Sequence, residues 1–96
     1  MSTFRIALGN LRFPKTPEES VTLAEHAIAE ASSERADIIC FPECFVPGYR
    51  GMGKVAPPPD STFLKNAWSV VRAAAAKANL AVVLGTERIV DNSLLA

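Results

Sequence analysis

The sequence has no excess of charge of either sign and no long hydrophobic run. Its 96 residues include ten basic and ten acidic side chains, so the formal net charge is zero. A balanced charge offers no electrostatic footprint for nucleic acid or for an anionic membrane surface, and we expect neither as a partner. No apolar stretch approaches the roughly 20 residues that a membrane-spanning helix needs.

Cysteine is scarce too, with only Cys40 and Cys44. Residues 1–5 have neither the basic segment nor the apolar core of a secretory signal, which argues against secretion. Two cysteines without such a signal indicate free thiols in a reducing compartment, so we expect a cytoplasmic protein. The pair is spaced C-x-x-x-C, and no histidine or second cysteine pair supports it. The sequence therefore predicts no metal site and no other cofactor.

The sequence does contain alternating strand and helix patterns. Strands are expected at residues 4–10, 37–41 and 80–84, helices at 16–33 and 61–79, and the start of a hairpin at 87–96. Thr16 and Glu19 fit a capping box, Asp60 or Ser61 fits a second cap, and Asn79 fits a left-handed helix stop. The order β-α-β-α-β-β, with the last hairpin strand cut short, predicts an α/β fold with a largely parallel sheet.

Such a sheet would have one uncovered face. Crossovers between parallel strands are right-handed, so both helices land on the same side if the strand order simply advances. The other side is then apolar and bare, and the short final strand leaves an unpaired edge. We therefore expect residues 1–96 to be a single incomplete domain, whose missing layer comes from later chain or from a partner.

The most informative segment follows the second strand. The apolar run at residues 38–41 ends at Pro42, which has no N–H to give a strand ladder. Glu43 then stands at the carboxyl edge of the sheet, where open α/β sheets place their chemistry. The plain alternative is a solvated glutamate that happens to follow a strand.

The wider sequence favours a catalytic role. Phe41-Pro42-Glu43, followed by Phe45 and then Gly48-Tyr49, resembles the catalytic-glutamate motif of the nitrilase (carbon–nitrogen hydrolase) superfamily. Cys44 departs from the aliphatic residue that is more usual there. Flanking segments resemble the family in the same order, at residues 4–11, 31–37, 82–87 and 92–93. The resemblance spans nearly the whole chain but only about the first third of a family domain. It implies the N-terminal portion of a four-layer α-β-β-α sandwich.

The resemblance also implies a chemistry. In this family a cysteine thiolate attacks an amide or nitrile carbon, a glutamate serves as general base and then acid, and a lysine stabilises the oxyanion. Glu43 matches the glutamate, whereas the segments that carry the lysine and the nucleophile are not among these residues. The resemblance thus predicts hydrolysis of a small amide or nitrile, and an isolated chain that is inert. The resemblance further implies a homo-oligomer. The alternative is that the chain associates through its uncovered sheet face.

Two further residues have two interpretations each, and each of the two cysteines has one expected role. Tyr49 either contacts substrate or packs a turn, and Arg50 either borders the substrate entrance or is solvated. Cys40 is expected to pack as a small hydrophobe, and Cys44 to point away from Glu43. Two rival functions remain. One is a non-catalytic truncated paralogue that acts as an interaction module, and the other is a thiol redox protein, which requires a fast-reacting cysteine.

Overall fold

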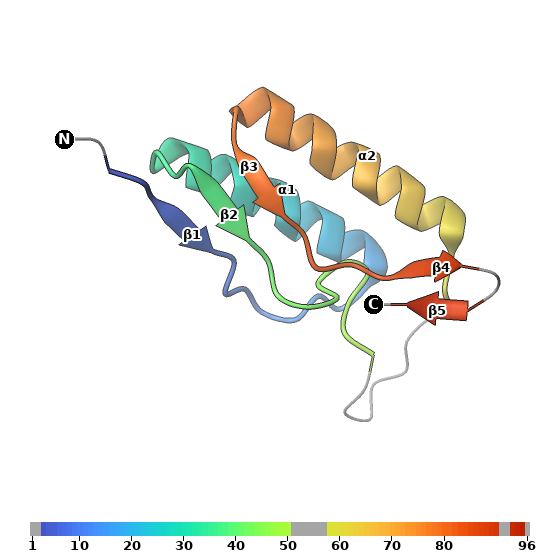
Figure 1. Cartoon of the computed structure of the whole chain (residues 1–96). Helices are drawn as coiled ribbons and strands as arrows, with labels where there is room; N and C mark the ends of the chain where they lie inside the picture. The colour runs from blue at the N-terminus through green and yellow to red at the C-terminus, as the bar shows by residue number, and fades with distance from the viewer. Residues whose placement is uncertain (1–2, 51–57, 91–92, 96) are drawn as a thin grey trace.

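Two helices pack on one face of a small parallel sheet (Figure 1). The structure, a computed structural model, describes residues 3–50, 58–90 and 93–95. The sheet contains β1 (Ile6–Leu8), β2 (Ile38–Cys40) and β3 (Ala81–Val83) in that order. The helices are α1 (Pro17–Ser33) and α2 (Ser61–Ala78), and an antiparallel hairpin of β4 (Arg88–Val90) and β5 (Ser93–Leu95) follows. The chain is therefore an α/β protein with the predicted order of elements, except that the hairpin supplies a full second strand.

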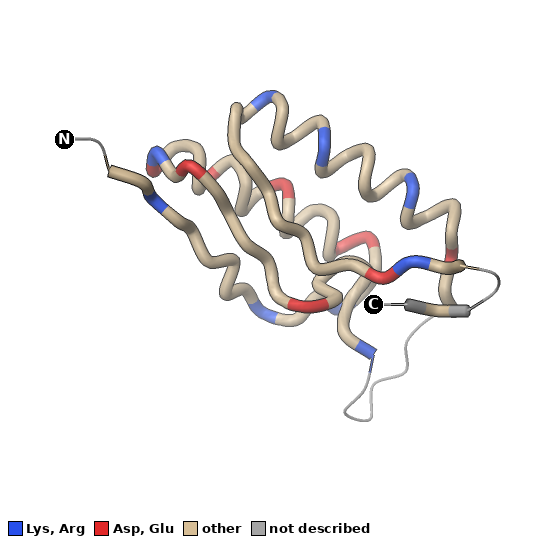
Figure 2. The backbone as a smooth tube through the Cα atoms, in the orientation of Figure 1, with Lys and Arg blue, Asp and Glu red and all other residues tan. Residues whose placement is uncertain are grey.

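The parallel register explains why one face of the sheet is bare. Each strand is only three residues long, so its central side chain faces the helices and its two outer ones face away. Ile39, at the centre of β2, is 2% exposed, whereas Leu8 is 75% and Val83 is 53% exposed. None of the residues in the three strands is charged (Figure 2). The prediction of an uncovered apolar face is confirmed for the described residues.

The core lies between the sheet and the two helices. Its buried side chains come from both helices, from β2 and from the segment after β2, and include Ala24, Ile28, Ile39, Phe41, Phe45, Val46, Ala67 and Val71. Alanines at these helix positions let α1 and α2 approach the sheet and each other closely. Three of these core residues, Phe41, Phe45 and Val46, lie within three positions of Glu43 in the chain.

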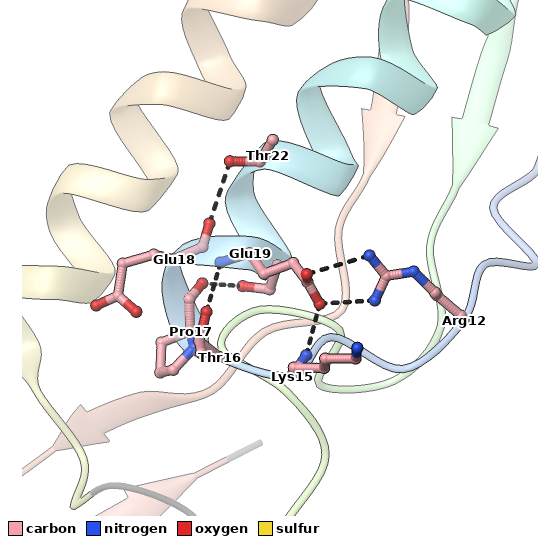
Figure 3. A network of polar contacts seen from close by, with 8 residues as sticks. Arg12, Lys15, Thr16, Pro17, Glu18, Glu19 and Thr22 are labelled. Atoms are coloured by element: carbon pink, nitrogen blue, oxygen red, sulfur yellow. Dashed lines mark hydrogen bonds and ion pairs between the residues drawn. The ribbon is translucent and has the colours of Figure 1, made fainter.

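Helix α1 begins at the predicted cap, but one contact differs from the prediction (Figure 3). Thr16 Oγ1 accepts a 3.0 Å hydrogen bond from the Glu19 N–H. The Glu19 carboxylate does not complete a capping box with Thr16. It accepts instead from the Lys15 N–H at 2.7 Å and from both terminal nitrogens of Arg12. The guanidinium draws the carboxylate one residue further back, because a bidentate pair between two charged groups is stronger than one hydrogen bond from an uncharged backbone N–H.

Both helices end in the same way. Arg35 at the end of α1 and Asn79 at the end of α2 have φ values of 61° and 50°. In each case the next residue closes the end of the helix, with Ala36 N–H donating to Ala31 O and Leu80 N–H donating to Ala75 O. This is the Schellman arrangement, and it turns the chain directly into β2 or β3. The predicted helix stop at Asn79 is confirmed. Arg35 forms a second left-handed helix end, which the sequence did not predict.

The rest of the predictions concern the connections. The long connection after β2 is described up to Arg50 and again from Pro58. The intervening residues, like the turn predicted at Asp91 and Asn92, lie outside the described part of the chain. Neither described helix combines the length and the apolar character that crossing a bilayer requires.

Candidate active site

Glu43 lies on a short turn immediately beyond β2. The strand ladder continues as far as Phe41, whose N–H donates to Val83 O at 2.9 Å. Pro42 then ends the ladder, and Phe45 N–H donates back to Pro42 O at 3.2 Å to close the turn. Glu43 stands exposed at the carboxyl edge of the parallel sheet, as the sequence predicts. Open α/β sheets place reactive groups at this edge.

The turn has a rigid base. Phe41 and Phe45, on either side of Glu43, are 7% and 4% exposed, and their ring centroids lie 5.4 Å apart. Val46 is completely buried. Cys44 adopts a φ of 49°, a left-handed conformation that a non-glycine residue keeps only when its surroundings hold it there. The backbone of Glu43 is thus anchored on both sides, by Phe41 and by Phe45 and Val46.

A groove of about 460 Å³ contains Glu43. Its walls come from the turn after β2, from helix α2, and from the connection between β3 and β4 together with the first residue of β4. The lining residues are Glu43, Cys44, Trp68, Leu84, Gly85, Thr86, Glu87 and Arg88. A larger hollow of about 680 Å³ lies at the N-terminal ends of both helices, but Glu43 does not line it. We assign the candidate site to the smaller groove, because it holds the carboxylate whose position the sequence predicts.

A second carboxylate in the groove is held in an ion pair. Glu87 is 2% exposed, and its Oε2 and Oε1 accept from Nε and a terminal nitrogen of Arg50, each at 2.8 Å. These hydrogen bonds raise the pKa of Arg50 above its ordinary value. The prediction of a solvated Arg50 is therefore wrong, because its side chain is only 26% exposed and donates two hydrogen bonds to Glu87. Tyr49 is 48% exposed and lies outside the residues that line the groove. Contact of Tyr49 with substrate stays a prediction.

The Cys44 thiol, next to Glu43, lacks the features of a nucleophile. Cys40 and Cys44 are both free and half-buried. Burial raises the pKa of the Cys44 thiol, and the negative charges of Glu43 and Glu87 raise it further, although Arg50 opposes them. A thiol with a raised pKa has little of the reactive thiolate at neutral pH. Within the described residues no group of three or more metal-ligating side chains comes together either.

Sequence reasoning located Glu43 but missed its neighbours. Glu87, Gly85 and Trp68 line the groove, yet the sequence offers no local signal for a contact between residues so far apart. The one available hint is that residues 82–87 were part of the family resemblance.

Comparison with known proteins found two matches to the sequence of this chain. Residues 5–93 match the family model described as carbon-nitrogen hydrolase. An arylacetonitrilase from the fungus Arthroderma benhamiae is 35% identical over 82 residues, a match that covers 75% of this chain and 24% of that enzyme. The chain thus spans about a quarter of the length of the curated relative it matches. No solved structure matches the chain.

Proposed function

This chain belongs to the carbon–nitrogen hydrolase family, and we propose that Glu43 is the general base of a hydrolase that acts on a small amide or nitrile. The observation that carries the proposal is the position of Glu43, exposed in a groove at the carboxyl edge of the parallel sheet. The backbone under it is held by buried aromatic residues on both sides, so the Glu43 side chain starts from a fixed point at the edge of the groove. A general base needs this placement, since proton transfer requires hydrogen-bond contact with the proton it removes.

In the proposed reaction Glu43 takes the proton of a cysteine thiol as the sulfur attacks the substrate carbon. For an amide, Glu43 then gives that proton to the departing nitrogen, so ammonia leaves and a thioester remains. Water, deprotonated by Glu43, cleaves the thioester to the acid and restores the thiol. The thiol and an oxyanion-stabilising lysine would come from chain beyond these residues, because Cys44 has a raised pKa and Cys40 does not line the groove. The isolated chain is accordingly proposed to be inert.

The choice of a first substrate follows from the comparison. The fungal relative is named an arylacetonitrilase, which favours a nitrile with an aromatic substituent over an aliphatic amide. An arylacetonitrile and its amide, tested side by side, separate the two substrate classes.

The test uses a chimera in which residues 5–93 of this chain replace the matching segment of the fungal arylacetonitrilase. We expect the chimera to release ammonia and Glu43→Gln to lower the rate by about 10²–10⁴-fold, the usual contribution of general acid–base catalysis. Glu25→Gln is the matched control, because Glu25 is another exposed glutamate on the outer side of α1. Equal activity of Glu43→Gln and Glu25→Gln would reject the role of Glu43.

The bare sheet face favours a second candidate function, that of a non-catalytic interaction module. Ile6, Leu8 and Val83 present apolar side chains that are more than half exposed on this face, and such patches mark contact surfaces. This function predicts that the isolated chain self-associates and that Leu8→Glu abolishes the association. Val70→Glu, on the outer side of α2, is the control. A monodisperse monomer in sedimentation equilibrium would count against the module.

A further inference from the structure

The connection from β3 to β4 touches the Glu43 turn at Gly85 and Thr86. Gly85 O accepts a 3.2 Å hydrogen bond from Val46 N–H, and Thr86 pairs with Val46 in a parallel bridge. On the other side of this connection, Trp68 Nε1 donates to Thr86 Oγ1 at 2.9 Å. The connection is therefore itself tied to α2 while it holds the turn.

The closest approach is between Gly85 and the residues on both sides of Glu43. A Cβ on Gly85 would lie 1.9 Å from Pro42 O and 2.9 Å from Cys44 N. Both obstacles are backbone atoms, which cannot rotate away as a side-chain tip can. The backbone of the turn thus rests directly on the backbone of Gly85, and its position depends on that of the connection.

Two residues further on, Glu87 holds the other end of the same loop. Its carboxylate binds Arg50 through two hydrogen bonds of 2.8 Å, at a site where the Glu87 side chain is 3% exposed. A buried charge of this kind keeps its partner in place, because separating them leaves the charge unpaired away from water. The loop from Pro42 to Arg50 is therefore fixed at its start by Gly85 and at its end by Glu87.

Glu87 lacks the freedom to act on a substrate directly. Both of its oxygens are occupied by Arg50, and its side chain is almost entirely buried. Glu43, by contrast, is exposed in the same groove. The two carboxylates therefore have different roles, although they line one site.

We propose that Glu87 is a positioning residue for Glu43: through its ion pair with Arg50, and together with the close contact of Gly85 on Pro42, it sets where the Glu43 carboxylate stands. This inference rests on the proposed function of Glu43. A misplacement of about 1 Å in a reacting group costs on the order of 10²-fold in rate. Loss of the ion pair should therefore lower kcat by about that factor and leave KM unchanged.

The experiment compares Glu87→Gln, which keeps the shape of the side chain but removes its charge, with Arg12→Gln. The control also breaks a bidentate ion pair, but an exposed one at the start of α1. In the chimera we expect Glu87→Gln to lower kcat about 10²-fold and Arg12→Gln to leave it unchanged. Glu87→Asp, which retains the charge, should recover part of the loss.

Amide hydrogen exchange provides a readout that does not depend on activity. In both the isolated chain and the chimera, Glu87→Gln should speed exchange at least tenfold in the peptide 42–49 and leave the peptides of α1 unchanged. Unchanged exchange in peptide 42–49, or faster exchange throughout the protein, would overturn the positioning role. A chimera that is inactive before any substitution would instead reject the proposed function, while the exchange result would still decide the role of Glu87.

Discussion

The indole Nε1 of Trp68 and the hydroxyl of Thr86 are joined by a hydrogen bond of 2.9 Å. Trp68 belongs to α2 and Thr86 to the connection between β3 and β4, so this contact links the helix layer to the segment that supports Glu43. Both side chains line the candidate groove and are half-buried. Trp68 is also the single tryptophan of the sequence, which makes its fluorescence a reporter of this part of the molecule.

The hydrogen bond should contribute measurably to stability. Thr86→Val keeps the size of the side chain but leaves the indole N–H without its acceptor, at a cost of about 1–3 kcal/mol in unfolding free energy. Urea denaturation followed by Trp68 fluorescence measures the change. Thr62→Val is the control, since Thr62 is an exposed threonine on α2, the helix that carries Trp68. If both variants unfold at the same urea concentration, the hydrogen bond contributes nothing in solution.

The contact of Gly85 with Pro42 predicts a larger effect. Gly85→Ala places a methyl group 1.9 Å from a backbone carbonyl, so the turn or the connection must move, at about 3 kcal/mol or more. Gly9→Ala is the matched comparison, because its nearest obstacle is a side-chain atom of Phe41 at 2.9 Å. We expect Gly85→Ala to lower the midpoint of thermal unfolding distinctly more than Gly9→Ala. The reverse order would mean that the close approach at Gly85 is absent in solution.

The sequence predicted those features that depend on local chemistry. Thr16, Asp60 and Asn79 each act on backbone groups a few residues away, and all three do what their residue types favour. Apolar runs predicted the three parallel strands, and the handedness of crossovers predicted the bare face. The position of Glu43 follows from the predicted strands, because Pro42 ends the second strand and Glu43 comes directly after it.

Contacts between residues that are distant in the chain could not be predicted from the sequence. Arg50 and Glu87 are 37 positions apart, and ten basic and ten acidic side chains allow many other pairings. The contact of Gly85 with Pro42 depends on how β3 and β2 align. Arg35 was missed for a different reason. Arginine is not a residue that favours a left-handed helix end, and only the structure shows that it occupies one.

Arg35 is therefore a place where stability can be gained. Its φ of 61° is costly for a residue with a Cβ, whereas glycine adopts this conformation freely. We expect Arg35→Gly to raise the unfolding free energy by about 0.5–1 kcal/mol, after allowing for the extra freedom of glycine in the unfolded chain. Chemical denaturation measures the gain. Ser33→Gly, inside the last turn of α1, should be destabilising, and a gain in both variants would contradict the explanation.

The network at the start of α1 predicts a specific dependence of stability on pH. The hydrogen bond from Arg12, followed by that from the Lys15 amide, lowers the pKa of Glu19 from 4.5 to about 2. A carboxyl whose pKa is lowered by folding stabilises the protein above its unfolded pKa. That stabilisation is lost as the pH falls from about 4.5 towards 2.

Wild type should therefore be more stable than Glu19→Gln above about pH 5, and the difference should vanish as the pH falls through about 2. Urea unfolding at pH values across this range measures it. Arg12→Gln should show much the same profile, because it removes the main cause of the shift. Both side chains are partly solvated, so added salt should reduce the difference. A difference that does not vary between pH 2 and pH 6 would show that the Arg12–Glu19 pair does not persist in solution.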